Sequence, residues 1–255
     1  MLYNTEAVVI RSIAYGETHA IVTLLTPSGK VAAMAKGAKK PQSRLTAGVQ
    51  LCVHGMYSIY QKTGMGTLSQ AEVLNSYRSL REQLEMAAYA AYFCELVAAV
   101  SDDRPNGDAR VYRLFLGALN RLTQAGENPA LTARVWEAKV LRLLGASPDW
   151  RECVRCQVTL AEEIVYSPSE GGFLCPSCAR NLHGLGKPVI PVPAGMARIL
   201  EMMTGVPWER LGQVNLNPRT QASLKQVLQF QMTEFAGLSL KSLEFLNSLD
   251  DWLTT

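Results

Sequence analysis

Four cysteines restrict the possible folds of this chain more than any other feature of its sequence. Cys153, Cys156, Cys175 and Cys178 form a C-x2-C-x18-C-x2-C pattern, a spacing typical of tetrahedral zinc sites. Four thiolates fill the coordination shell and leave no position for water or substrate, so we expect one structural Zn²⁺ per chain. Two disulfides or four unrelated buried thiols are the alternatives, but nothing else in the sequence indicates an oxidising compartment.

The segment between the two cysteine pairs predicts a small metal-bound module at residues 150–183. An apolar run at 164–166, a Pro-Ser-Glu-Gly-Gly turn at 168–172 and Phe173-Leu174 are typical of the hairpin of a zinc ribbon. We expect each cysteine pair to lie on a tight turn. His183, five residues after Cys178, is a weaker alternative to one of the cysteines as a ligand.

Length and composition indicate an ordinary globular protein. The chain has 255 residues, of which 48% are hydrophobic and 18% charged, and this length suggests about two domains. Its first residues lack the basic and apolar regions of a signal peptide, and no apolar stretch is long enough to span a bilayer. We therefore expect a soluble cytoplasmic protein without a membrane partner. Cys52 and Cys94 lie in apolar surroundings and are expected to be buried.

Positive charge is concentrated in the first third of the chain. The whole chain has a net charge of +3, but residues 1–78 contain eight lysines and arginines against three glutamates, and the remainder is slightly acidic. Such an asymmetry points to a polyanionic partner for the first third. A modest excess of this kind can also belong to a solvated face.

The first third also has the pattern of a small β-barrel. Short runs rich in β-branched residues predict strands at about 7–14, 20–26, 29–35, 50–61 and 67–73, separated by turns. Five strands without room for crossover helices imply an antiparallel sheet that closes on itself. We expect an OB-type barrel, although a small SH3-like barrel fits the strand count nearly as well.

Beyond residue 75 the apolar residues recur at helical spacing. Helices are expected at about 75–100, 108–125, 129–144, 194–204, 218–235 and 239–249, with turn formers at 101–107. In the third helix Arg134, Glu137 and Lys139 lie outside the apolar stripe. The predicted fold is therefore α+β and multidomain. A five-stranded OB-type antiparallel barrel at 1–78 is followed by an all-helical domain at 79–255 that carries the zinc-ribbon insert with its four cysteines.

A basic loop on the barrel rim is the main candidate for binding nucleic acid. Lys36, Lys39, Lys40 and Arg44 fall within nine residues, together with a glycine and a proline that disfavour regular structure. We expect a mobile cationic loop whose charges suit backbone phosphates. Short basic loops are common, however, and many of them are only solvated.

Further candidates come from the strands and turns of the barrel. Arg11, Lys30 and Lys62 add basic groups, and Tyr57 offers an aromatic platform for stacking a base. Tyr60 lies three residues further along the same strand, so only one of the two tyrosines can face a groove. A tyrosine packed in the barrel is an equally good interpretation of either one.

No pattern in the sequence supports catalysis. There is no P-loop, no G-x-G-x-x-G fingerprint and no G-x-S-x-G elbow, and the three histidines lie far from any carboxylate cluster. We expect neither enzymatic activity nor a small-molecule substrate.

Several of these features together resemble the bacterial RecO family of recombination mediators. The resemblance rests on E-A-V-V-I-R at 6–11, Y-G-E at 15–17, A-K-G-A-K-K at 35–40 and the two cysteine pairs, and it extends along essentially the whole chain. It implies an OB-fold domain, a helical domain with a zinc module, and no nucleotide hydrolysis. Some members of the family lack the cysteines, so the resemblance does not make the metal a functional requirement.

The resemblance also implies a role and partners. It implies DNA repair and homologous recombination in the RecFOR pathway, with binding of single- and double-stranded DNA, strand annealing, and a location in the cytoplasm with the nucleoid. The expected partners are RecR, single-strand-binding protein and, indirectly, RecA. For the acidic, hydrophobic tail of single-strand-binding protein, the candidate residues, which match no family motif, are Arg198, Arg219, Leu224, Lys225 and Leu228.

Two other classes of function remain open from the residues alone. An RNA-binding or ribosome-associated scaffold with a structural zinc ribbon is the main alternative, and relative binding to single-stranded DNA and folded RNA separates the two. A nuclease or nucleotidyl transferase is the third class, but the sequence lacks the carboxylate cluster that such an enzyme needs.

Overall fold

The structure, a computed structural model, describes residues 1–101 and 109–253, with side chains described up to Leu249. Contacts between residues divide the chain into two compact units, Met1–Gly126 with Leu240–Thr255, and Glu127–Ser239. The barrel therefore shares its unit with helices that the sequence assigns to a separate domain beginning at residue 79. Of the turn expected at 101–107, only residue 101 is described, and the rest lies outside the described residues.

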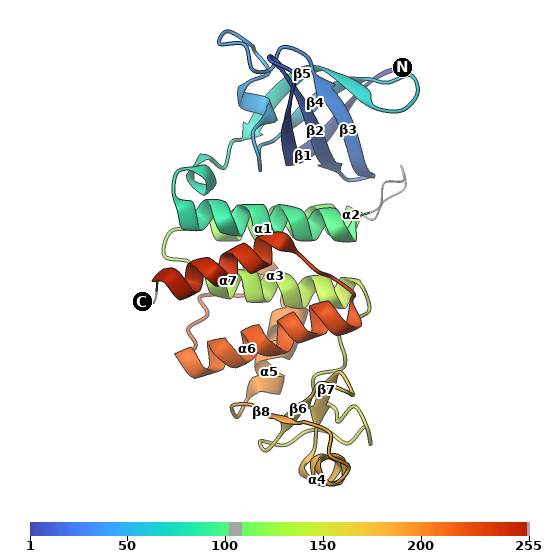
Figure 1. The fold of residues 1–255 in the computed structure, drawn as a ribbon, viewed down its shortest axis with the longest axis vertical. Helices are drawn as coiled ribbons and strands as arrows, with labels where there is room; N and C mark the ends of the chain where they lie inside the picture. Colours follow the sequence, from blue (N-terminus) through green and yellow to red (C-terminus); the bar gives the residue numbers. More distant parts are fainter. Residues whose placement is uncertain (102–108, 254–255) are drawn as a thin grey trace. The chain divides into compact units, whose positions relative to one another are not determined.

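The first unit opens with a closed five-stranded β-barrel (Figure 1). Its strands are β1 (Leu2–Tyr15), β2 (His19–Thr26), β3 (Gly29–Ala35), β4 (His54–Tyr60) and β5 (Gly66–Asn75), and they close in the order β1-β2-β3-β5-β4. β1 pairs with β4 through its first half and with β2 through its second half. The OB-type barrel is confirmed. One expectation was wrong: β3 and β5 are parallel, because an odd number of strands cannot close with every pair antiparallel.

Alternation along the strands places small and β-branched side chains inside the barrel. The core contains Ala7, Val9, Val22, Leu24, Ala33, Ala35, Tyr57 and Ile59. Gly66 lies where β5 meets β3, and a Cβ atom on it would be 2.6 Å from Cγ2 of Ile59. A glycine suits this position because the side chain of Ile59 on the neighbouring strand β4 already fills the space that another side chain would need.

Three helices and two short 3₁₀ turns complete the first unit. They are η1 (Ala47–Val49), η2 (Arg78–Arg81), α1 (Leu84–Val100), α2 (Ala109–Leu122) and α7 (Lys241–Leu253). α1 begins later than the sequence suggests, because β5 continues to Asn75 and Tyr77 adopts a left-handed conformation with φ of 42°. The side chain of Asn75 accepts a hydrogen bond from the Tyr77 backbone, so it caps a turn rather than a helix.

The last helix, α7, is held against α1 by a carboxylate. Glu95 of α1 accepts hydrogen bonds from the backbone N–H groups of Lys241 (3.2 Å) and Ser242 (2.8 Å), which would otherwise lack partners at the start of α7. Burial raises the pKa of the Glu95 carboxyl, but the hydrogen bonds from Ser242 and Lys241 outweigh this effect and lower it. The C-terminal segment thereby joins the barrel's unit.

Polar and sulfur contacts join the barrel to its helices. The carboxylate of Glu6 accepts a hydrogen bond from the hydroxyl of Tyr112 (3.1 Å) and lies 2.7 Å from Nε2 of His54. Cys52 and Cys94 are buried as expected, and their sulfur atoms are 3.5 Å apart. They remain free thiols.

The second unit is built around α3. Its elements are α3 (Pro129–Leu143), β6 (Val165–Ser167), β7 (Gly172–Leu174), α4 (Pro176–Gly184), β8 (Ile190–Pro191), α5 (Met196–Gly205), η3 (Trp208–Arg210), α6 (Pro218–Phe230) and the π-helical turn η4 (Gln231–Phe235). α5 and α6 pack on α3. Asn128 and Asn217 cap α3 and α6 by accepting backbone hydrogen bonds of 3.1 and 2.9 Å, and each precedes a proline.

Three charged residues in the middle of α3 are buried, contrary to the sequence expectation. Every residue from 131 to 141 is buried, including Arg134, Glu137 and Lys139. Arg134 forms an ion pair with Glu137 at 2.9 Å. Lys139 donates a hydrogen bond to the carbonyl of Val206 and lies over the ring of Trp208 at 5.4 Å from its centroid. An apolar stripe predicts only one covered face, whereas α3 is covered all round.

The π-helical turn at the end of α6 is associated with a buried glutamine. Gln231 is 1% exposed, and its amide accepts a hydrogen bond from the hydroxyl of Tyr166 (3.1 Å) and donates one to the carbonyl of Gly171 (3.0 Å). The helical unit is thereby fixed to the strand β6 and its turn. Within the described residues, no helix combines the length and apolar character needed to cross a membrane.

Lys139→Met should change how stability depends on pH. Burial and, next, the charge of Arg142 lower the pKa of Lys139 to about 8, below the value of about 10.4 for an unfolded lysine. The unfolded chain binds more protons between these values, so the wild type gains stability as pH rises through them. Urea titrations should show the free energy of unfolding of the wild type rising by about 2 kcal/mol relative to the variant between about pH 7.5 and 10. Parallel curves for the two proteins would contradict this assignment.

Candidate metal centre and nucleic-acid interface

The first cysteine pair lies on a tight turn before β6. The N–H of Cys153 donates to the carbonyl of Val158 (2.9 Å), and the N–H of Gln157 donates to the carbonyl of Cys153 (2.8 Å). Gln157 takes the left-handed φ of 60° that lets the chain reverse directly after Cys156. This turn agrees with the sequence expectation for the first pair.

The second pair lies at the start of a helix. Cys175 follows β7 and is the N-cap of α4, and Cys178 lies in the first turn of that helix. We expected a second tight turn here, and this was wrong: the second pair lies at the start of a helix. The start of α4 thereby brings both sulfur atoms to the same end of the helix.

The four sulfur atoms are arranged for a single metal ion. The ligand atoms of Cys153, Cys156, Cys175 and Cys178 all lie within 4.8 Å of one another, and those of Cys156 and Cys175 are 3.8 Å apart. Metal–sulfur bonds of about 2.3 Å in a tetrahedron place sulfurs about 3.8 Å apart, whereas a disulfide requires about 2.05 Å. The spacing therefore fits a tetrahedral metal site and excludes disulfides in this structure. His183 is exposed and does not belong to the group.

The electrostatics of the cluster also favour a cation. Burial alone raises the pKa of Cys153, but N–H groups of Cys175, Cys156 and Arg155 that point at its sulfur lower it to about 6. Burial, followed by hydrogen bonds with the other thiols, raises the pKa of Cys178 to about 12. Four thiolates at this distance repel one another, and a divalent ion removes that repulsion.

The basic loop is a series of anchored turns rather than the open, mobile loop that we expected. The N–H of Gly37 donates to Nδ1 of His19 (2.9 Å), and the N–H of Lys39 donates to the carbonyl of Thr18 (2.9 Å). Ala38 is buried in the barrel core, and its carbonyl accepts a hydrogen bond from Thr46 (2.7 Å). The loop is therefore held against the β1–β2 turn.

The side chains of this loop point into solvent. Lys36, Lys39, Lys40 and Arg44 are all exposed, although the backbone beneath them is fixed. Arg44 also lines a hollow of about 530 Å³ beside β4 and β5. Charges that need no fixed geometry can follow a sugar-phosphate backbone without reading its bases.

The outer face of β1, β2 and β3 adds an apolar platform next to the loop. Residues that pair directly across strands share a face, and Ile13 pairs with Ile21, which in turn pairs with Met34. Tyr15 pairs with His19, the residue that anchors the loop, and is 51% exposed. The structure thus places an exposed aromatic ring near the lysines.

Two family models match this chain, one over the barrel and one over the helices that follow it. The family model described as recombination protein O N terminal matches residues 1–77, and that described as recombination protein O C terminal matches residues 81–244. The chain belongs to the RecO family. The break between the two matched regions lies close to the domain boundary expected from the sequence, although the compact units divide elsewhere.

Curated relatives in this family match along nearly the whole chain. The DNA repair protein RecO of Bacillus subtilis (strain 168) is 37% identical over 253 residues, which cover 98% of this chain and 96% of the relative. That of Bacillus pumilus (strain SAFR-032) is 36% identical over 253 residues, covering 98% and 95%. That of Halalkalibacterium halodurans is 34% identical over 251 residues, covering 98% and 96%.

In this RecO-family chain, Tyr57 cannot be the stacking platform that the sequence suggested. It is 1% exposed, and its hydroxyl lies 2.9 Å from the carbonyl of Gly48 and 3.1 Å from that of Val53. Tyr60 is 45% exposed, on the other face of β4. Tyr15 was not among the candidates because the expected strand ends at residue 14, whereas β1 continues to Tyr15 and residues 11–15 are all exposed.

The other basic candidates are not all brought together. Arg11 is exposed on the same strand face as Tyr15. Lys30 donates a hydrogen bond to the carbonyl of Ala98 at 2.7 Å, near the end of α1, so its ammonium stabilises the packing of that helix. Lys62 is exposed, and it lines a separate hollow of about 880 Å³ together with Lys30.

Two of the expected partner-binding residues are inaccessible. Leu224 and Leu228 are 0% exposed, because they form the face of α6 that packs inward. They cannot line a surface pocket for the tail of another protein, so that interpretation was wrong. Arg198 and Arg219 are exposed and Lys225 is partly exposed. The helical spacing of apolar residues on α6 predicts a stripe that faces the core, and Leu224 and Leu228 belong to that stripe.

Cys175→Ser should release the metal and lower thermal stability. The variant leaves three sulfurs for a site that needs four ligands, and the free energy of metal binding is part of the free energy of folding here. We expect less than about one tenth of the wild-type metal content by elemental analysis, together with a lower Tm. Cys94→Ser removes a buried thiol outside the cluster and is the matched control, which should keep its metal. Wild-type protein that contains no metal when freshly purified would refute the prediction.

Proposed function

We propose that this chain is a DNA repair and recombination mediator that binds single- and double-stranded DNA and anneals complementary strands. The exposed lysines on an anchored rim loop, next to an exposed tyrosine, are the observation that carries the proposal. Relatives named DNA repair protein RecO that match nearly the whole chain support it. We propose that it acts by binding rather than by catalysis, in the cytoplasm and with the nucleoid.

The partners that we propose follow from the family resemblance. The chain would act with RecR to load RecA onto strands covered by single-strand-binding protein, as in the RecFOR pathway. The exposed guanidinium groups of Arg198 and Arg219 remain available for an acidic partner, but without the leucines that were expected beside them.

The mechanism that we propose depends on where the contacts fall on the DNA. Annealing requires two polyanions to be held close while their Watson–Crick edges stay free. Lysines at 36, 39 and 40 would neutralise phosphates, and the outer face of β1–β3 would carry unpaired bases without sequence preference. Both contacts are independent of sequence, which suits a protein that anneals any complementary pair.

We propose that the metal is Zn²⁺ and that its role is structural. Four thiolates in a tetrahedron are typical of zinc, and the small core beneath them contains only three fully buried residues, Cys153, Leu174 and Leu182. When bound, zinc supplies the cross-link that this core is too small to provide. The cysteines themselves hold the first turn against the start of α4.

Changing Lys39, Lys40 and Arg44 together to alanine should weaken binding of single-stranded DNA to a similar extent for all base compositions. Each lost phosphate contact lowers the slope of log K against log salt by about 0.7 on single strands, so the slope should fall by about 2. Annealing of complementary strands, with and without single-strand-binding protein, should slow in parallel. Fluorescence anisotropy over a salt series measures the first effect.

The matched control removes the same charge from the other unit, as Arg180→Ala, Lys187→Ala and Arg210→Ala, all exposed positions. It should leave the slope nearly unchanged. An unaltered slope in the loop variant, or tighter binding of folded RNA than of single-stranded DNA by the wild type, would count against the proposed interface.

Tyr15→Ala should weaken binding to single-stranded DNA by about tenfold, because a base–aromatic stack contributes about 1–3 kcal/mol. The salt slope should not change, since no charge is lost. Tyr15→Phe keeps the ring and should bind like the wild type, and Tyr57→Phe controls for loss of a buried hydroxyl. Equal affinities for the alanine variant and the wild type would exclude Tyr15 from the interface.

A further inference from the structure

A second positively charged site lies in the helical unit, and it includes Arg198, one of the partner-binding candidates. A cavity of about 600 Å³ is bounded by the end of α3, the loop at 145–151 and α5. Three arginines line it, Arg142, Arg151 and Arg198. Cavities of this size hold small ligands or the end of a larger one.

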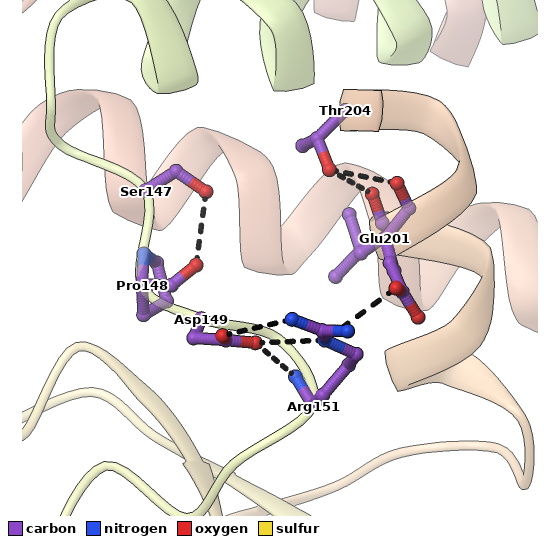
Figure 2. Close-up of polar contacts among 7 residues, drawn as sticks. Ser147, Pro148, Asp149, Arg151, Glu201 and Thr204 are labelled. Atoms are coloured by element: carbon purple, nitrogen blue, oxygen red, sulfur yellow. Dashed lines mark hydrogen bonds and ion pairs between the residues drawn. The ribbon is translucent and has the colours of Figure 1, made fainter. Parts of the chain in front are cut away.

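One of the three arginines is already held in place by acids (Figure 2). The backbone N–H of Arg151 donates to Asp149 at 2.9 Å, and its guanidinium lies 3.4 Å from each carboxylate oxygen of that residue and 3.4 Å from Glu201. These hydrogen bonds, from the backbone first and then from the side chain, lower the pKa of Asp149. The guanidinium is therefore fixed, and both acids in the cavity are engaged with it.

The other two arginines leave an excess of positive charge. Among the residues that the structure describes, Arg142 and Arg198 form no ion pair, so three guanidinium groups face two carboxylates. Lys139 adds a buried ammonium, because it donates to the carbonyl of Val206, a residue of the cavity wall. Like charges gathered in this way repel one another unless an anion lies between them.

We propose that this cavity binds a phosphate dianion, as free phosphate or as the 5′-phosphate of a DNA strand. Three guanidinium groups on different walls offer more donors than one planar carboxylate can accept, whereas a tetrahedral phosphate presents oxygens in several directions. Only binding of the 5′-phosphate of a DNA strand rests on the proposed function. Free phosphate would bind whether or not the barrel binds DNA.

The test compares phosphate binding by the full-length protein and by Arg142→Gln/Arg198→Gln. Thermal unfolding with inorganic phosphate, against chloride at matched ionic strength, should raise the Tm of the wild type and leave that of the double variant unchanged. Both arginines are exposed, so the double variant should fold, and its Tm in chloride checks this. Arg180→Gln/Arg210→Gln removes the same charge from exposed positions outside the cavity, and its phosphate response should equal that of the wild type.

A further comparison assigns the source of the phosphate. If strand ends are the ligand, the wild type should bind a 5′-phosphorylated oligonucleotide at least about fivefold tighter than its 5′-hydroxyl form, and the double variant should bind the two forms equally. Equal binding of the two oligonucleotides by the wild type, together with a phosphate-dependent Tm, assigns the site to free phosphate.

Three results would overturn the proposal. They are no phosphate-dependent rise in the Tm of the wild type, an equal rise in the double variant, and stronger stabilisation by an acidic peptide than by phosphate. The variant with Lys39, Lys40 and Arg44 changed to alanine should keep the full phosphate response. Failure of the barrel interface is thus distinguished from failure of this site.

Discussion

Closure of the barrel determines which residues can act as an interface. β1 pairs with two partners, and the remaining strands must close around a narrow interior filled by residues such as Ala33 and Ala35. Once the register is set, every second side chain must point outward. Tyr57 is inside for this reason, whereas Tyr15 lies at the end of β1, where residues 11–15 are exposed on both faces. A slip of one residue in β1 would exchange the apolar outer row with the core, so the shape of the interface and the stability of the barrel have the same origin.

Anchoring of the basic loop changes the energetics of binding. A mobile loop must lose backbone freedom when it binds, at about 1–2 kcal/mol per residue. Here Gly37, Ala38 and Lys39 are already hydrogen-bonded to the β1–β2 turn or to Thr46. Binding then orders only the long side chains, which still adapt to phosphates at variable positions. The result is a preorganised backbone that carries adaptable charges, which suits tight but unselective binding of a polyanion.

The sequence predicted correctly those features of the structure that depend on residues close together in the chain. The cysteine spacing, the strands from residue 20 to 35, and the Asn217-Pro218 start of α6 all depend on neighbours within a few residues, and the structure confirms them. The errors concern packing between distant segments. Arg134 and Lys139 lie outside an apolar stripe, yet α3 is covered on every side. Leu224 was placed in a partner pocket although its helical spacing already predicts it on the inward face of α6, where it is buried.

The metal module illustrates how a small segment is held together without a core of its own. Between residues 150 and 183 the strands β6 and β7 have only three residues each, and the cluster beneath the sulfurs buries few side chains completely. The rings of Tyr166 and Phe173 are also buried, but they contact each other and Phe230 of α6 rather than the sulfurs. The end of the segment that carries the sulfurs therefore has little hydrophobic burial to offset the entropy of ordering it. Four converging thiols supply the difference once a cation binds, because its binding energy adds directly to folding. A site closed by four sulfurs has no position for a reactant, so its effect on the rest of the unit is mechanical. A larger apolar core in the same place would stabilise the segment in the same way.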